Sequence, residues 1–384
     1  MSAQAAPPAP KLTLAWETCV KLRSRAASCR ACVDACPTKA IAFDGPRESV
    51  AVDLSKCIEC GLCQAACPTE SFSGAVDVPA FLATAPADVK CTNAPAPPGE
   101  MAGERGRPPL CLAALSAEDL VVLALKHGTL RVDVQGCAQC RTAPLGQQAL
   151  TSRVEQAREL LVALGAKARI TVALEKPGAA PVPAPLPSGE KGPNSRRAFL
   201  RRLVPPAIAE RVAPPPPRLE LDVTKLRPAI LRSQEPPPRR LRLLAALDAA
   251  KLPAPKARLP EELVGFASSK ALDVNTCTAC ALCVTTCPTG ALSTSTVRDE
   301  LRFDASRCVK CHTCHDVCEP RAITKAKTFD LGHFVSREVR ALGRLTIKSC
   351  AECGAPFKHG GGEDFLCERC RDLDEEAREL VGLE

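Results

Sequence analysis

The chain has 384 residues and a formal net charge of +8, from 51 basic and 43 acidic residues. It contains ten Phe, one Trp and no Tyr, which argues against large aromatic cores, and its 24 cysteines far exceed ordinary usage. The length allows two to four domains, and small domains without a large core need another source of stability, such as a metal centre. The modest basic excess fits an acidic protein partner or a solvated surface equally well.

The N-terminal residues give no sign of export. Residues 1–10 have neither the basic nor the apolar segment of a signal peptide, and no apolar run in the sequence is long enough to span a bilayer. We therefore expect a protein without a membrane span in the reducing cytoplasm, where thiols stay free to bind metals.

The first module, predicted over residues 11–85, carries a cysteine pattern that the chain repeats. Seven of its cysteines recur 251 positions later with unchanged spacing, from Cys29 and Cys280 through to Cys67 and Cys318. The pairs between these are Cys32 and Cys283, Cys36 and Cys287, Cys57 and Cys308, Cys60 and Cys311, and Cys63 and Cys314. Spacing held this rigidly around thiols indicates that the chain wraps a fixed inorganic group.

Three cysteine runs share the spacing Cys-x2-Cys-x2-Cys-x3-Cys, and they begin at Cys57, Cys277 and Cys308. This pattern resembles the bacterial-type 2[4Fe–4S] ferredoxins, in which the fourth cysteine of each run binds the other cluster. The resemblance implies two short hairpins and two helices in each module, and four [4Fe–4S] clusters in the chain. Three of the implied ligand sets are Cys36, Cys57, Cys60 and Cys63; Cys277, Cys280, Cys283 and Cys318; and Cys287, Cys308, Cys311 and Cys314.

The fourth cluster departs from the family pattern. Its three regular ligands are Cys29, Cys32 and Cys67. Ala26 stands where Cys277 stands in the repeat, and Cys19 is the only cysteine upstream, so we assign Cys19 as the fourth ligand, brought in by the loop 20–28. A [3Fe–4S] cluster or a labile fourth site is the alternative. For all four sites, a disulfide knot or zinc is disfavoured by the expected compartment and by the spacing of the runs.

The middle module, predicted over residues 86–175, alternates strands with helices. We expect strands at 89–92, 110–112, 130–134 and 168–174, and helices at 117–126 and 146–164. Cys91, Cys111, Cys137 and Cys140 fall at or near the carboxyl ends of strands, where sites form in α/β units. Gly136-Cys137-x2-Cys140 resembles the hydrogenase-associated iron–sulfur subunits that supply heterodisulfide reductases, which implies a [2Fe–2S] cluster. A redox-active dithiol and a structural zinc are the alternatives.

Residues 176–270 contain no cysteine and several proline-rich stretches. We predict a basic linker there, with a short helix near 240–250. The segment 195–201 resembles a twin-arginine export motif, but Pro205 and Pro206 interrupt the apolar run that should follow. A short basic amphipathic helix is the better interpretation.

The second module is predicted over residues 271–330. Its last run contains His312 and His315, which we expect to be exposed residues beside a cluster, because the cysteines already suffice as ligands.

The C-terminal segment predicts a zinc ribbon over residues 345–375. Cys350-x2-Cys353 and Cys367-x2-Cys370 form two knuckles, the spacing of a closed four-thiolate structural site. Rubredoxin-type iron is the alternative. The acidic stretch 374–379 argues against a nucleic-acid partner.

Together these patterns predict an α+β multidomain chain of two ferredoxin-like modules, a small α/β module, a zinc ribbon and Pro-rich linkers. The function expected from the resemblance is that of a polyferredoxin, which passes single electrons to or from a partner oxidoreductase or hydrogenase-like complex. We expect no catalytic site in the chain itself. The alternatives are a thiol/disulfide redox enzyme subunit that uses Cys137 and Cys140, and an iron–sulfur redox sensor.

Overall fold

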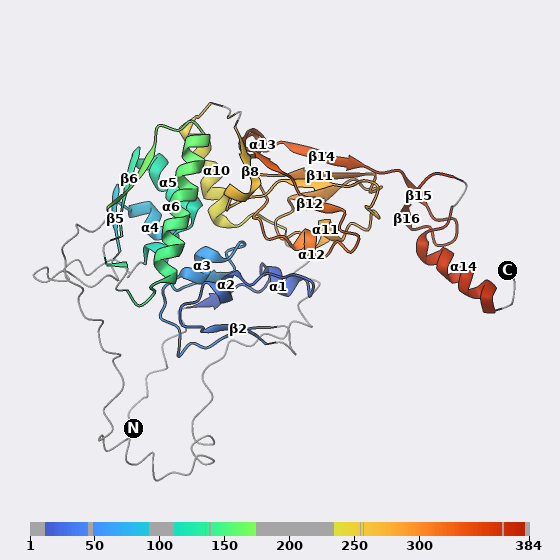
Figure 1. Cartoon of the computed structure of the whole chain (residues 1–384), viewed down its shortest axis with the longest axis horizontal. Coiled ribbons are helices and arrows are strands. Elements are labelled where there is room, and N and C mark those ends of the chain that lie inside the picture. Colours follow the sequence, from blue (N-terminus) through green and yellow to red (C-terminus); the bar gives the residue numbers. More distant parts are fainter. Residues whose placement is uncertain are drawn as a thin grey trace, which may run out of the picture.

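The fold is α+β, with helices packed against several small sheets (Figure 1). The computed structural model describes residues 12–44, 49–91, 111–134, 136–137, 140–173, 234–253, 255, 257–362 and 365–380. Within these ranges, no helix has both the length and the apolar character needed to cross a membrane. The motif-like segment 195–201 and most of the predicted linker lie outside the described residues.

The first module consists of short helices between two antiparallel strand pairs. Its elements are β1 (Thr13–Leu14), α1 (Val20–Arg23), α2 (Ala31–Asp34), β2 (Ile41–Asp44), β3 (Ser49–Val52), α3 (Leu62–Ala66), β4 (Phe72–Ser73) and α4 (Val78–Thr84). Strand β1 pairs with β4, and β2 pairs with β3. Leu14, Ile41, Val52 and Phe72 from these strands are buried together, so a small apolar core lies beside the cysteine loops.

The second module repeats this plan. Its elements are β9 (Lys270–Leu272), α11 (Leu282–Thr285), β10 (Leu292–Thr294), β11 (Glu300–Asp304), α12 (Thr313–Asp316) and β12 (Ile323–Lys325). Ile41 pairs with Val52 in the first module, and Leu292 pairs with Phe303 in the second, which is the same register 251 positions on. The sequence repeat is therefore also a structural repeat.

The middle module contains a parallel sheet in the order β5-β6-β7. Its elements are β5 (Asp88–Lys90), the 3₁₀ helix η1 (Leu112–Ala114), α5 (Ala117–His127), β6 (Thr129–Asp133), α6 (Leu145–Ala163) and β7 (Arg169–Ala173). Ser116 and Asp119 form a capping box that starts α5, since each side chain accepts a bond from the backbone of the other. The strand predicted at 110–112 is not formed in its described part. Leu112 instead starts η1, whose residues are all buried and lack the alternation of a strand.

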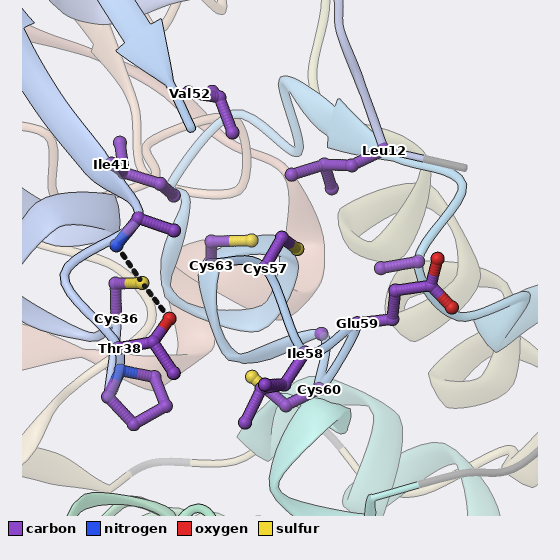
Figure 2. A pocket seen from close by; sticks show the side chains of 14 residues that line it. Leu12, Cys36, Thr38, Ile41, Val52, Cys57, Ile58, Glu59, Cys60 and Cys63 are labelled. Atoms are coloured by element: carbon purple, nitrogen blue, oxygen red, sulfur yellow. Dashed lines mark hydrogen bonds between the residues drawn. The ribbon is translucent and has the colours of Figure 1, made fainter. Parts of the chain in front are cut away.

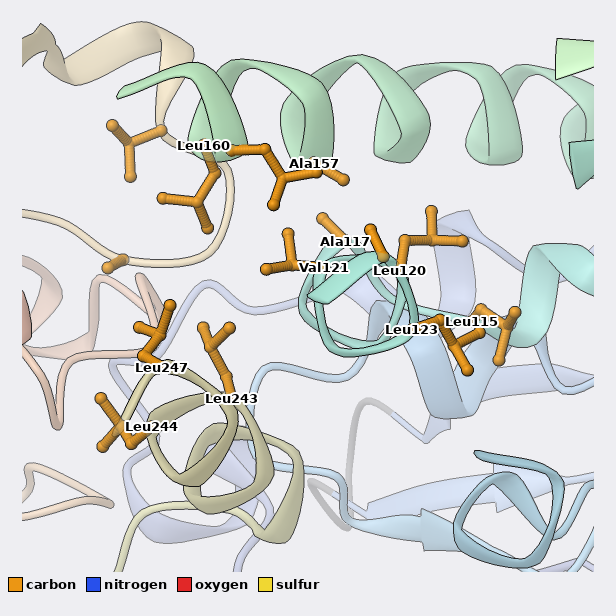
Figure 3. Packing of buried hydrophobic residues seen from close by; sticks show 14 of the residues in the cluster. Leu115, Ala117, Leu120, Val121, Leu123, Ala157, Leu160, Leu243, Leu244 and Leu247 are labelled. Carbon is orange, nitrogen blue, oxygen red and sulfur yellow. The ribbon is translucent and has the colours of Figure 1, made fainter. Parts of the chain in front are cut away.

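The helix α10 (Pro238–Ala250) joins the modules through a shared core (Figure 3). Its Leu243, Leu244 and Leu247 are buried in the same apolar cluster as Leu120 of α5 and Leu160 of α6. Figure 1 shows α10 between the middle module and the second module.

The predicted linker is therefore shorter than residues 176–270. The helix expected near 240–250 is present as α10, but residues 234–270 also form β8 (Arg258–Pro260) and the 3₁₀ helix η4 (Glu261–Leu263). Strand β8 pairs with β13 (Thr328–Asp330) beyond the second module. These residues pack as part of the fold because their leucines have apolar partners in distant segments, which proline content alone does not reveal.

The chain ends in a separate small unit. It follows α13 (Leu331–Ser336) and β14 (Val339–Arg344), the latter an added strand on the β10–β11 sheet. The unit consists of β15 (Ile347–Ser349), β16 (Pro356–Lys358) and the exposed helix α14 (Glu368–Leu380), which projects away from the other modules (Figure 1).

Candidate metal centres

Four cavities, two in each cysteine module, are each lined by four thiols. The empty space around their lining residues measures about 360, 350, 320 and 320 Å³, part of it open to solvent. Their cysteines are Cys36, Cys57, Cys60 and Cys63; Cys277, Cys280, Cys283 and Cys318; Cys287, Cys308, Cys311 and Cys314; and Cys19, Cys29, Cys32 and Cys67. The structure thus brings together each of the four sets derived from the sequence. Their similar size fits four copies of one group.

The cavity of Cys36, Cys57, Cys60 and Cys63 shows how these sites are built (Figure 2). The four thiols surround a common space, three of them from one loop and Cys36 from the other half of the module. The apolar side chains of Leu12, Ile41, Val52 and Ile58 complete the wall. A centre held here would be shielded from water, which is the condition under which protein groups set a cluster's potential.

The cysteine loops turn tightly by adopting left-handed backbone conformations at matching positions. In the first loop these positions are Glu59, with φ 54°, and Gly61, with φ 73°. The other two runs have Ala279, Ala281, Lys310 and His312 there, all with φ between 54° and 60°. A side chain at Gly61 would also meet the Cβ of Ala114 at 2.7 Å, because the middle module packs directly against this loop.

Several sulfur atoms accept hydrogen bonds. The amides of Ala40 and Ser71 donate to Cys36 Sγ at 3.2 Å and Cys67 Sγ at 3.3 Å. A threonine two positions after the cysteine also contacts the sulfur, at 3.6 Å for Cys36 and Cys67 and 3.7 Å for Cys287. Cys318 has Pro320 at this position and lacks the hydroxyl. Because such bonds stabilise the reduced cluster, the four sites are not equivalent.

The position of Cys19 follows from strand register. Leu14 pairs with Phe72, just as Leu272 pairs with Ile323, and Phe72 and Ile323 are matched by the repeat. Cys19 lies five residues after Leu14, as Cys277 lies five residues after Leu272. The extra seven residues of the first module therefore fall after Cys19, which stands ten positions before Cys29 rather than three.

Burial raises the pKa of most of these thiols. It raises the pKa of Cys19, Cys63, Cys283 and Cys311 to about 12. A thiol with so high a pKa is protonated at neutral pH, so metal binding must displace the proton. Such thiols are unsuited to act as free nucleophiles, but they suit ligands that are buried against a metal centre.

The comparison with protein families gives two matches to a 4Fe-4S dicluster domain, at residues 27–71 and 276–323. The chain contains two 4Fe-4S dicluster domains. These domains point to iron–sulfur electron transfer, and two diclusters suggest four [4Fe–4S] clusters. The first match starts at residue 27 and so leaves out Cys19, whereas the second includes Cys277. No curated protein matches the chain.

The four thiols of the middle module lie near one another, but they are less closely surrounded by other residues than the thiols of the four cavities. Strands β5 and β6 are parallel neighbours, and Cys91 and Cys137 follow their carboxyl ends. A hydrogen bond to the Cys91 side chain, together with burial, raises the pKa of Cys111. Burial, with the nearby charges of Cys91 and Cys140, raises the pKa of Cys137 to about 11. The four predicted residues therefore form one group at the end of the sheet.

The C-terminal cysteines are packed more tightly than this. Among the residues that the structure describes, Cys350, Cys353, Cys367 and Cys370 are the one group of potential ligands whose atoms all lie within 4.8 Å of one another. The sulfurs of Cys353 and Cys367 are 3.7 Å apart. Two sulfurs on a tetrahedral zinc are separated by about 3.8 Å. This group fits a single ion, zinc or iron, whereas the sulfurs of the other thiol sets do not all lie within 4.8 Å of one another.

His312 and His315 are half-buried, not exposed as predicted. Burial lowers the pKa of His312 to about 3 and that of His315 to about 4. His315 Nε2 lies 3.0 Å from Nζ of Lys270, so the neutral imidazole accepts its hydrogen bond. This contact could not be predicted from the sequence, because Lys270 comes from the distant strand β9.

Two arginines of α10, which the sequence did not single out, contact two different cysteine cavities. Arg239 donates to the carbonyl of Cys67, and Arg240 donates to the carbonyl of Cys308 at 2.7 Å. Both are buried, and both pair with Glu118 of α5, at 3.0 Å and 2.6 Å. The basic character of this region could be read from the sequence, but the acidic partner inside the same chain could not.

Proposed function

We propose that the protein is a polyferredoxin-type electron carrier that holds four [4Fe–4S] clusters in the four thiol-lined cavities. The observation that supports this most is that each cavity has four thiols from two separate segments and nearly equal size. In this proposal Cys19 completes the ligand set of Cys29, Cys32 and Cys67. When bound, each cluster would supply one-electron chemistry without a proton.

The residues of the chain would hold the clusters, shield them from water and adjust their reduction potentials. The cysteines hold the irons, while Leu12, Ile41, Val52 and their counterparts exclude water from the sulfurs. The amides that donate to Cys36 and Cys67 stabilise added negative charge. Because a buried charge is costly unless it is compensated, these contacts favour the reduced state.

We further propose that the middle thiols hold a [2Fe–2S] cluster at one end of the cluster series. Gly61, beside Cys60, packs against Ala114, three residues after Cys111, so this site adjoins the cavity of Cys36, Cys57, Cys60 and Cys63. At the other end, Cys280 is exposed and Leu282 is 50% exposed. A partner oxidoreductase would exchange electrons at this exposed end.

The thiol-enzyme alternative is less well supported. An attacking thiol works as its thiolate, and such cysteines usually have a lowered pKa. The pKa of Cys137 is raised instead, to about 11, by burial and by neighbouring thiols.

We propose that the ribbon cysteines hold a structural zinc, which fixes the C-terminal unit beside the second module.

Metal analysis of the anaerobically purified full chain tests the proposal. We expect about sixteen irons and as many sulfides per chain for four clusters, and about eighteen irons if the middle site is also filled. One zinc is expected for the ribbon. Replacing Cys137 and Cys140 with serine should remove only the two additional irons and a [2Fe–2S] signal in the EPR spectrum. Iron far below sixteen in a folded protein would contradict the proposal.

A further inference from the structure

The first module carries an insertion that its repeat lacks. Residues 20–28, hereafter the inserted segment, separate Cys19 from Cys29, whereas only two residues separate Cys277 from Cys280. The insertion contains α1 and does not extend the strands of the module. A cluster can be wrapped without it, as the second module demonstrates by its spacing. The added residues therefore require a different explanation.

Arg23 of the inserted segment is buried against the second module. Its side chain is 2% exposed, and its Nε donates to the carbonyl of Thr286 at 3.4 Å. Thr286 directly precedes Cys287. Burial lowers the pKa of Arg23, and the negative charges of Cys287 and Cys311 oppose this change. The backbone amide of Arg23 also donates to the carbonyl of Cys19 at 3.1 Å, so one cation links a ligand of the first module to the residue before a ligand of the second.

A second contact lies at the other end of the inserted segment. The backbone amide and the hydroxyl of Ser28 both donate to Asp316 Oδ2, at 2.8 Å and 2.9 Å. Ser28 directly precedes Cys29, and Asp316 is the last residue of α12, two positions after Cys314. The negative charge of Asp316 contributes to the raised pKa of Cys29, after burial and other neighbours. The edges of two cavities in different modules therefore meet here.

Arg239 and Arg240 provide a second set of contacts between the same two cavities. Arg239 contacts the carbonyl of Cys67, and Arg240 contacts that of Cys308. The two arginines are adjacent in sequence and share the carboxylate of Glu118. Two separate networks thus join the same two cysteine sites.

We propose that electrons pass between the two modules across the inserted segment, with Arg23 as a positioning residue for this step. The exchanging clusters would be the one held by Cys19, Cys29, Cys32 and Cys67 and the one held by Cys287, Cys308, Cys311 and Cys314. The inference rests on the proposed function of the four sites. In each step one cluster loses one electron and the other gains it, with no proton and no further reactant.

The chemistry of Arg23 suits this role. A cluster with four thiolate ligands is negatively charged, and each added electron increases that charge. A buried cation between two such clusters lowers the cost of placing the electron on either one, because attraction is strong where water is excluded. Its contact with Thr286 also fixes the distance between the modules.

Replacing Arg23 with glutamine in the full holo-protein tests whether the charge of Arg23 affects the potentials of the clusters. We expect the midpoint potentials of both inner clusters to become more negative, while those of the two outer clusters stay unchanged. The clusters are assigned first through Cys32→Ser and Cys314→Ser, each of which alters one inner cluster. Arg23→Lys should restore the potentials, and the matched control Arg25→Gln, an exposed residue of the same segment, should not alter them. Unchanged potentials in Arg23→Gln would overturn the proposal.

Removing residues 21–27 tests the electron step itself. This deletion leaves Val20 and Ser28 between Cys19 and Cys29, which is the spacing that the second module uses. After addition of less than one electron per chain, rapid-freeze EPR follows how the electron spreads over the clusters. In the natural chain we expect it to reach both modules, and in the deletion variant this phase should be lost. Equal rates in the two proteins would overturn the proposal.

The metal content separates this inference from the proposed function. If the natural chain lacks four clusters, the proposed function fails. If it holds about sixteen irons, and the electron spreads equally fast with and without the inserted segment, only the inference fails.

Discussion

At the scale of single residues, cysteine spacing carried most of the information. Ligands that lie in one tight loop must have fixed spacing, so three thiols of each regular set could be predicted from the sequence, and the resemblance to bacterial-type ferredoxins implied the crossed fourth thiol. Cys19 was assigned because it is the only cysteine upstream, although the repeat places Ala26 at the matching position, and the strand register explains where it lies. Arg23 and Glu118 could not be predicted, since their partners lie more than one hundred residues away along the chain.

Replacing Cys19 with alanine should change one cluster only. Without its fourth thiolate, the cluster of Cys29, Cys32 and Cys67 should lose about one iron and convert to a [3Fe–4S] form. Iron analysis and EPR of the oxidised protein measure this conversion. Cys91→Ala is the matched control: Cys91 lines none of the four cavities, so its loss can remove iron from the middle site only and should leave the EPR signals of the four [4Fe–4S] sites unchanged. A full iron load and an unaltered spectrum in Cys19→Ala would show that Cys19 is not a ligand.

Replacing Glu118 with glutamine should destabilise the assembled chain. Two buried arginines would lose their shared counter-charge, and breaking a buried pair in this way costs about 3–5 kcal/mol. The midpoint of urea unfolding, followed anaerobically by the visible absorbance of the clusters, reports the change.

The matched control for this network is Asp248→Asn, on the helix that carries both arginines. Asp248 pairs with Arg337 at the surface, where both side chains are about half exposed, so its loss should cost at most about 1 kcal/mol. If Glu118→Gln were no more harmful than this control, the buried network would not hold the modules together.

At the scale of elements, local patterns gave the type of most segments. The helices α5 and α6 and the strands β6 and β7 were predicted within one or two residues, because caps, glycine stops and periodicity agree there. The predicted strand at 110–112 failed, since buried residues in a short run do not distinguish a strand from a 3₁₀ turn. Helix α10 was expected, but its burial was not.

Substitutions at two leucines of α10 distinguish the contribution of its buried face from that of helix propensity. Leu243 is fully buried, and Leu243→Ala should destabilise the protein by about 2–5 kcal/mol. Leu241 is 54% exposed on the same helix, and Leu241→Ala should change stability by less than about 0.5 kcal/mol. Urea unfolding curves of both variants measure the difference, and equal effects would contradict the packing of α10 in the shared core.

The folding of the C-terminal unit should depend on its own metal ion and not on the four clusters. Cys353→Ser removes one of four ligands, so the ion should be lost and α14 should become sensitive to proteases. The iron of the four clusters should stay constant, because α14 projects away from them (Figure 1). Metal analysis combined with limited proteolysis tests this, and retention of zinc by the variant would exclude the ribbon site.

At the scale of the whole molecule, the two cysteine modules and the middle module pack into one assembly. The two modules are tied by the inserted segment and by α10, and the middle module packs on the outer site of the first. From the sequence we expected separate modules, because the predicted helix near 240–250 gave no indication that it would be buried against all three. Long-range charge pairs such as Arg240 with Glu118 leave no local pattern from which the assembly could be inferred.

A reductive titration of the anaerobic full chain, with electrons counted coulometrically and unpaired spins counted by EPR, tests most directly whether the chain holds four [4Fe–4S] clusters. We expect the chain to take up about four electrons, one for each [4Fe–4S] cluster, and about one more if the middle site holds a [2Fe–2S] cluster. Uptake of two electrons or fewer by a fully loaded protein would contradict it.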